Sequence, residues 1–133
     1  AVNVVQETAE RCRIGRLTRN QHVLFELGEL MTRAEIAANF ARYAAGRAAP
    51  RYQPFFAPSA LKAMSRICAR EAALDVLGLA VRLVRGMDAV DDAGIADFER
   101  ALRSSAITAC AKGLMADMDV VAKALVEQDA ARA

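Results

Sequence analysis

Apolar residues recur at three- and four-residue spacing along most of this 133-residue chain, and no stretch shows the period of two that marks a half-buried strand. The spacing is clearest from Val23 to Ala45 and from Leu61 to Leu83. Between these regions, the segment 48–58 holds three prolines, which exclude regular helix. The sequence therefore predicts an all-α fold of long helices.

Capping residues and glycines mark the ends of the predicted helices. Thr18 is the expected N-cap of the second helix, and Gly46 lies near its end. Ser59 is expected to open the third helix and Gly86 to end it. The last helical region is expected to break near Gly113.

With a short opening helix over 2–13, these regions predict an antiparallel four-helix bundle whose last helix is broken near Gly113. We expect one domain over residues 1–133, because a chain of this length can bury a core of its own. The chain has no initiator Met and begins inside a predicted helix, so we also expect a fragment of a longer chain or a trimmed one.

The third predicted helix should be the most buried, because Ile67, Leu74 and Val81 lie off its main apolar face. A helix with two apolar sides packs against two neighbours. The predicted core consists of Val23, Leu27, Leu30, Met64, Cys68, Val76, Leu83, Leu102 and Ala109. The third helix and the last region carry more apolar surface than one such core covers, so self-association is expected.

Composition disfavours nucleic-acid and membrane partners. The net charge is +2 with acids and bases interspersed, aromatic residues make up 5% and Trp is absent, whereas nucleic-acid-binding domains collect basic residues on one face and single-strand binders use aromatic platforms. The one basic cluster, Arg11, Arg13, Arg16 and Arg19, is either a solvated helix end, which composition favours, or an anion site. No apolar run approaches the roughly 18 residues of a membrane span, and no signal peptide is visible.

No metal site or catalytic constellation stands out. Cys12, Cys68 and Cys110 are odd in number and widely spaced, and His22 is the only histidine, which argues against zinc. Cys68 and Cys110 fall on apolar helix faces and are expected to be buried thiols, which suits a cytoplasmic location. A calcium loop counted from Asp88 lacks the ligand and the glycine required at its third and sixth positions.

The closing segment carries a family resemblance. Arg103-Ser-Ser-Ala-Ile-Thr-Ala-Cys-Ala-Lys112-Gly113-Leu114 resembles the closing motif R-D-A-x-x-x-x-I-Y-E-G-T of the acyl-CoA dehydrogenase family, without a gap through Gly113. In that family the glutamate is the usual catalytic base, and Lys112 stands in its place; Ser104 replaces the Asp and Leu114 the Thr. Lysine is cationic unless strongly desolvated, so the resemblance implies the architecture of the family without a catalytic residue in this chain.

Two further segments resemble parts of that family that contact its flavin. The segment Arg11-Cys-Arg13-Ile14-Gly-Arg resembles R-x-Q-F-G-R, a turn that helps to hold the FAD diphosphate of a neighbouring subunit. The segment Arg82-Leu-Val-Arg85-Gly86 stands where the family has Q-x-x-G-G, which meets the adenine end of the flavin across the dimer. The resemblance thus implies these cofactor-binding candidates: Arg11, Arg13, Ile14, Arg82, Arg85 and Gly86.

The resemblance implies the C-terminal helical domain of an acyl-CoA dehydrogenase-like flavoprotein, an oxidoreductase of fatty acid metabolism. Such a domain contributes to a flavin and acyl-CoA site and to association with further copies or with a related acyl-CoA dehydrogenase subunit. The family's site also needs an N-terminal helical domain and a β-domain, so this chain alone is expected to be inactive and not to hold FAD by itself. The alternative is a non-catalytic helical oligomerisation or interaction module without cofactor.

Overall fold

The computed structural model describes residues 1–46, 56–88 and 90–130, and every regular element in these ranges is an α-helix. The helices are α1 (Val2–Ile14), α2 (Gln21–Ala44), α3 (Pro58–Arg85), α4 (Asp92–Ala101), α5 (Ser104–Ala109) and α6 (Leu114–Ala130). The all-α prediction is confirmed for this part of the chain. The predicted proline-rich break at 48–58 lies mostly outside the described residues.

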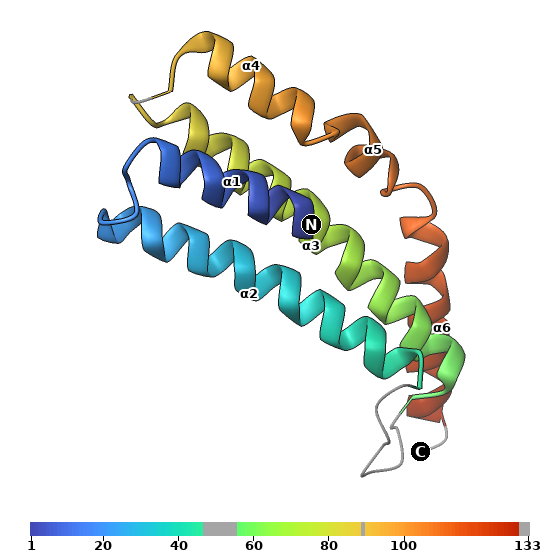
Figure 1. Ribbon diagram of the computed structural model, residues 1–133. Helices are drawn as coiled ribbons and strands as arrows, with labels where there is room; N and C mark the ends of the chain where they lie inside the picture. Colours follow the sequence, from blue (N-terminus) through green and yellow to red (C-terminus); the bar gives the residue numbers. More distant parts are fainter. Residues whose placement is uncertain (47–55, 89, 131–133) are drawn as a thin grey trace.

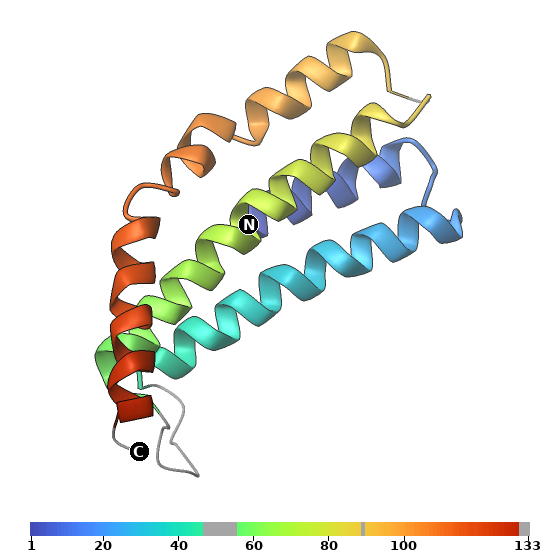
Figure 2. The same ribbon diagram turned by 180° about the vertical axis from the view of Figure 1, so that it is seen from behind.

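α3 is the central helix and packs against each of the other helices. In Figure 1 it runs behind α1, with α2 and α4 on opposite flanks, and the view from behind in Figure 2 shows the same two helices on either side of it. From α4 the chain continues through α5, and α6 then runs along the beginning of α3. As predicted, α3 is the most buried helix; its buried residues are Ala60, Ala63, Ser65, Ala72, Val76, Leu77, Leu79, Ala80 and Val84.

Two helix starts differ from the sequence-based prediction. α2 is capped by Asn20 and not by Thr18, because the Asn20 side-chain oxygen accepts hydrogen bonds from two first-turn N–H groups at 3.0 and 3.4 Å. α3 begins at Pro58, one residue before Ser59. Proline suits the first helical position because its missing N–H would have no partner there. The predicted end of α3 is confirmed, with Gly86 as its C-cap.

The C-terminal region is broken twice rather than once. The predicted break near Gly113 is confirmed: this residue has φ +86° between α5 and α6. A second break separates α4 from α5 at Arg103, which has φ +50°. No glycine marks this break in the sequence, although the left-handed region favours glycine.

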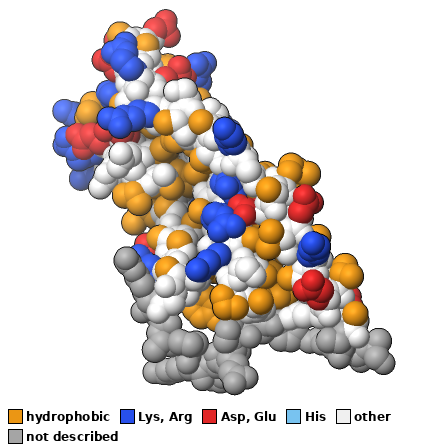
Figure 3. Space-filling model, turned by 90° about the vertical axis from the view of Figure 1, so that its right-hand side faces the viewer, with side chains coloured by type: hydrophobic (Ala, Val, Ile, Leu, Met, Phe, Trp, Pro, Cys, Tyr) orange, Lys and Arg blue, Asp and Glu red, His pale blue; other side chains and the backbone are white. Residues whose placement is uncertain are grey.

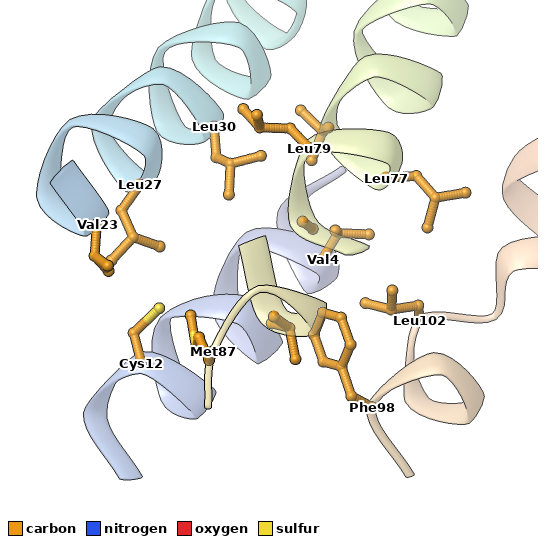
Figure 4. Packing of buried hydrophobic residues seen from close by; sticks show 13 residues of the cluster. Val4, Cys12, Val23, Leu27, Leu30, Leu77, Leu79, Met87, Phe98 and Leu102 are labelled. Carbon is orange, nitrogen blue, oxygen red and sulfur yellow. The ribbon is translucent and has the colours of Figure 1, made fainter. Parts of the chain in front are cut away.

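The buried apolar cluster joins α1, α2, α3 and the α4 region (Figure 4). Of the predicted core, Val23, Leu27, Leu30, Val76 and Leu102 are buried, and Met64, Cys68 and Leu83 are partly buried. The assignment of Ala109 to the core is wrong, because it is exposed. The break at Arg103 changes the phase of the helical stripe, and Ile107 packs against the cluster instead.

We expect Gly113→Ala to lower the free energy of unfolding by about 1–2 kcal/mol, because a residue with a Cβ is strained in the left-handed region. The added Cβ would also lie 3.3 Å from Arg70 Nη2. Gly28→Ala is the matched control, since Gly28 lies inside α2 and an added Cβ there has nothing within 4 Å. This change is expected to stabilise by about 0.5–1 kcal/mol. Chemical denaturation measures both, and a shift of the same sign in the two variants would contradict the prediction.

Candidate functional site

The cofactor-binding candidates lie at one end of the molecule. Three of them are in the last turn of α1, and three are in the last turn and C-cap of α3. Figure 1 places these two helix ends and the beginning of α2 on the same side. We call this region the arginine end, defined by Arg11, Arg13, Arg16, Arg19, Arg82 and Arg85.

The turn after α1 is closed by a left-handed arginine. Arg16 has φ +55°. Its N–H donates to the carbonyl oxygen of Arg13 at 3.1 Å, and the N–H of Leu17 donates to that of Cys12 at 2.9 Å. These two bonds are those of a Schellman ending. Leu17 packs against the buried cluster that contains Cys12, and this contact fixes the turn on the core. The Arg16 side chain is exposed.

A surface pocket of about 450 Å³ lies on this turn, lined by Arg13, Arg16, Thr18 and Arg19. Three guanidinium groups and a hydroxyl can donate hydrogen bonds there, and no acidic side chain lines the pocket. Arg13 is also paired with Glu10, at 2.6 Å between Nη2 and Oε1. Their hydrogen bond raises the pKa of Arg13 and lowers the pKa of Glu10. The lining suits an anion of the phosphate type, which arginine binds with charge-assisted hydrogen bonds.

The other two candidates on α1 do not line this pocket. Arg11 is partly buried, and Ile14 is exposed at 60% of its surface. Of the α1 residues that the family resemblance implies, the structure therefore brings only Arg13 into the pocket.

Arg82 and Arg85 are each paired with an acid on a neighbouring helix. Arg82 Nη2 lies 3.4 Å from a carboxylate oxygen of Glu26 on α2, and Arg85 Nε lies 2.7 Å from Glu99 Oε1 on α4. Their side chains remain 72% and 60% exposed, so these surface pairs contribute little stability. The Gly86 N–H donates to the Arg82 carbonyl at 3.1 Å and ends α3. These arginines therefore present positive charge to solvent at the end of α3.

Lys112 lies away from the arginine end. It is exposed on the turn between α5 and α6, and Figure 1 shows that turn on the opposite side from the end of α3. The turn contacts Arg70 of α3, which is about 18 Å along the helix axis from Arg82. Within one chain, the structure does not bring Lys112 together with the flavin-binding candidates.

A charged cluster joins α3 to α6 near this turn. Asp117 is 6% exposed and is the only buried residue of α6 within the described part of the helix. Arg66 Nε lies 3.0 Å from each of its oxygens, and Arg70 forms a second ion pair with it. Arg70 Nε also donates to the Cys110 carbonyl at 2.8 Å. We call Arg66, Arg70, Asp117 and Cys110 the Asp117 cluster.

Hydrogen bonds from Arg66 and Arg70 hold the pKa of Asp117 well below its ordinary value. A carboxylate stabilised in this way is a poor proton acceptor. The Asp117 cluster is therefore built to hold helices together and not to move protons. Sequence analysis missed it, although Arg66 and Arg70 are four residues apart on α3 and so share one helix face.

The thiols offer no further site. Cys12 is buried, and burial raises the pKa of its thiol. Cys68 and Cys110 are only partly buried, whereas the sequence predicts buried thiols at both positions. Among the described residues, no three or more His, Cys, Asp or Glu side chains are placed to hold a metal ion. No helix in the described ranges is long and apolar enough to span a membrane.

Comparisons with known proteins give no match for this chain. No family model matches it, and neither does any curated protein or any solved structure. The residues and their geometry are thus the basis for assigning a function.

Proposed function

We propose that this chain is the C-terminal helical domain of an acyl-CoA dehydrogenase-like flavoprotein. Its role is to bind the adenosine diphosphate part of FAD and to associate subunits, while proton removal is left to residues outside this chain. The observation that carries the proposal is the pocket on the α1–α2 turn, lined by Arg13, Arg16, Thr18 and Arg19. That turn is the one that resembles the family's diphosphate-binding segment.

The donor chemistry of the arginine end fits a diphosphate. Arg13, Arg16 and Arg19 would hold the phosphate oxygens, because guanidinium groups bind such oxygens in a fixed fork. Arg82 and Arg85, at the end of α3, would lie toward the adenine. FAD supplies a hydride acceptor when it is bound. The residues of this chain bind and orient its nucleotide end only.

The separation of Lys112 from the arginine end supports a flavin site to which two subunits contribute. In the family, the diphosphate turn helps to hold the flavin of a neighbouring subunit, and the closing segment carries the residue that faces the flavin. Two separate places on one chain, about 18 Å apart along α3, suit that division. Lys112 is exposed and stands where the family has its glutamate, so this position offers no carboxylate base.

Exposed apolar side chains support association with further copies or with a related acyl-CoA dehydrogenase subunit. Phe25 and Met31 on α2 are 70% and 61% exposed, and Met115 and Val126 on α6 are 70% and 69% exposed. Figure 3 shows hydrophobic side chains spread over the face of the molecule that carries α5 and α6. Exposed apolar surface of this kind favours a contact. We infer an antiparallel four-helix bundle, with α4, α5 and α6 together as the broken fourth helix, in an oligomer of a cytoplasmic protein.

One observation favours the alternative, a helical oligomerisation module without cofactor. Arg13, Arg82 and Arg85 each have an acidic partner already, in Glu10, Glu26 and Glu99 respectively. Arginines with such partners need no ligand to balance their charge.

ADP binding to the purified chain separates the two functions, because ADP carries the diphosphate and adenine without the flavin ring. We expect weak binding by calorimetry that falls as salt rises. The double variant Arg13→Gln/Arg19→Gln should weaken it about tenfold or more, because each arginine would donate a charge-assisted hydrogen bond. Arg42→Gln is the control, since Arg42 is an exposed arginine in the last turn of α2.

Sedimentation of the same samples should show a dimer or a larger species. Association without ADP binding would favour the module without cofactor. ADP binding that is unchanged in the double variant would contradict the site at the α1–α2 turn.

A further inference from the structure

The α5–α6 turn is held by one side chain of α3, that of Arg70. Arg70 Nε donates to the Cys110 carbonyl at 2.8 Å, and its Nη1 pairs with the Asp117 carboxylate. Cys110 ends α5, and Asp117 belongs to the first turn of α6. A single guanidinium therefore bridges the two helix ends on either side of the break. Its side chain is only 17% exposed, so water competes weakly for these contacts.

The apolar side chains of α6 are half-buried or exposed, and Leu114, Val121 and Ala124 are the half-buried ones. Asp117 is its only buried residue within the described part of the helix. Met115 and Val126 are largely exposed. The Asp117 cluster is accordingly a fixed polar contact between α6 and α3.

Arg66 and Arg70 have different tasks in this cluster. Both pair with Asp117, but only Arg70 also reaches the backbone of the turn. The glycine at 113 is matched to this arrangement, because an added Cβ would lie 3.3 Å from Arg70 Nη2. Lys112, between Cys110 and Gly113, forms no hydrogen bond or ion pair through its side chain within the described residues.

We propose that Arg70 is the positioning residue of the α5–α6 turn: its planar guanidinium fixes the Cys110 carbonyl relative to Asp117 and thereby sets the place of Lys112. Arginine suits this task because its donors form a rigid fork that can serve two acceptors at once. Because the Cys110 carbonyl is taken by Arg70, the Lys112 ammonium is not drawn back to cap α5 and stays on the outer side of the turn. This positioning is independent of the proposed function.

Hydrogen exchange measured by NMR on the full chain tests the proposal without flavin or ADP. The reporters are the Ala111 and Lys112 amides, which donate to Thr108 and Ala109 carbonyls at 3.2 Å. Amides of α2 in the same sample correct for any overall loss of stability. Arg70→Gln should speed exchange at the reporters about tenfold or more, because it leaves the turn carbonyl without its charged donor.

Arg66→Gln is the matched control, since it removes an arginine from Asp117 and leaves the contact with Cys110 intact. Its effect on the reporters should be much smaller than that of Arg70→Gln. Equal acceleration in the two variants, or none in Arg70→Gln, would overturn the proposal.

Arg70→Lys keeps the positive charge but replaces the fork by a single ammonium. We expect it to recover most of the melting temperature lost in Arg70→Gln while the reporter amides still exchange fast. Should Arg70→Gln fail to fold, Arg70→Lys takes its place in the comparison with Arg66→Gln. Slow exchange in Arg70→Lys equal to that of the parent chain would show that charge alone is sufficient, and the fork would then have no positioning role.

Discussion

Phe98→Ala is expected to lower the free energy of unfolding by about 3–5 kcal/mol. Phe98 is 1% exposed, belongs to the largest fully buried side chains and is the only buried residue of α4. Figure 4 shows its ring pointing into the cluster, with Leu102 on one side of it. The change removes a ring and leaves a cavity that the surrounding helices can fill only in part. Urea denaturation followed by circular dichroism measures the loss.

Phe25→Ala is the matched control for this substitution. The chemical change is the same, but Phe25 is 70% exposed on α2. Its removal should change stability by no more than about 0.5 kcal/mol. Comparable losses in the two variants would mean that α4 does not pack against the cluster as described.

Leu30→Ala is expected to lower the free energy of unfolding by about 2–5 kcal/mol. Leu30 is fully buried on α2 and belongs to the same cluster as residues of α1, α3 and α4. Leu24→Ala is the control, because Leu24 lies on the same helix and is 50% exposed. A loss for Leu30→Ala below about half a kcal/mol would show that α2 is wrongly placed on α3.

The two core variants also report on cooperativity. Leu30 and Phe98 lie on helices that flank α3 on opposite sides, yet they belong to one cluster. Both variants should therefore unfold in a single transition with unchanged dependence on urea. A separate early transition in Phe98→Ala would show that α4 can detach while α2 and α3 remain folded.

Local signals account for the parts of the fold that sequence analysis predicted. Gly86 ends α3, and Gly113 separates α5 from α6 in the left-handed conformation that favours glycine. The turns at Arg16 and Arg103 are left-handed without glycine. Their conformation is imposed by tertiary contacts, such as the packing of Leu17 against the core, and a local pattern does not contain that information.

The candidate site likewise has one part that could be predicted from the sequence and one part that could not. The arginines after α1 are neighbours in the sequence, so their gathering around one pocket follows from a single turn. The Asp117 cluster joins residues that are 47 and 51 positions apart. Its members become neighbours only when α6 is laid along α3, and the apolar spacing of the last region had suggested no buried acid there. Long-range pairs of this kind depend on topology, which periodicity does not specify.

One continuous helix connects the two regions that carry the functional argument. α3 has 28 residues, with Arg66 and Arg70 toward one end and Arg82 and Arg85 at the other. Arg70 and Arg85 are about 22 Å apart along its axis. Because α3 is unbroken and packs against each of the other helices, it acts as a rigid spacer that keeps the Asp117 cluster and the arginine end at a constant separation.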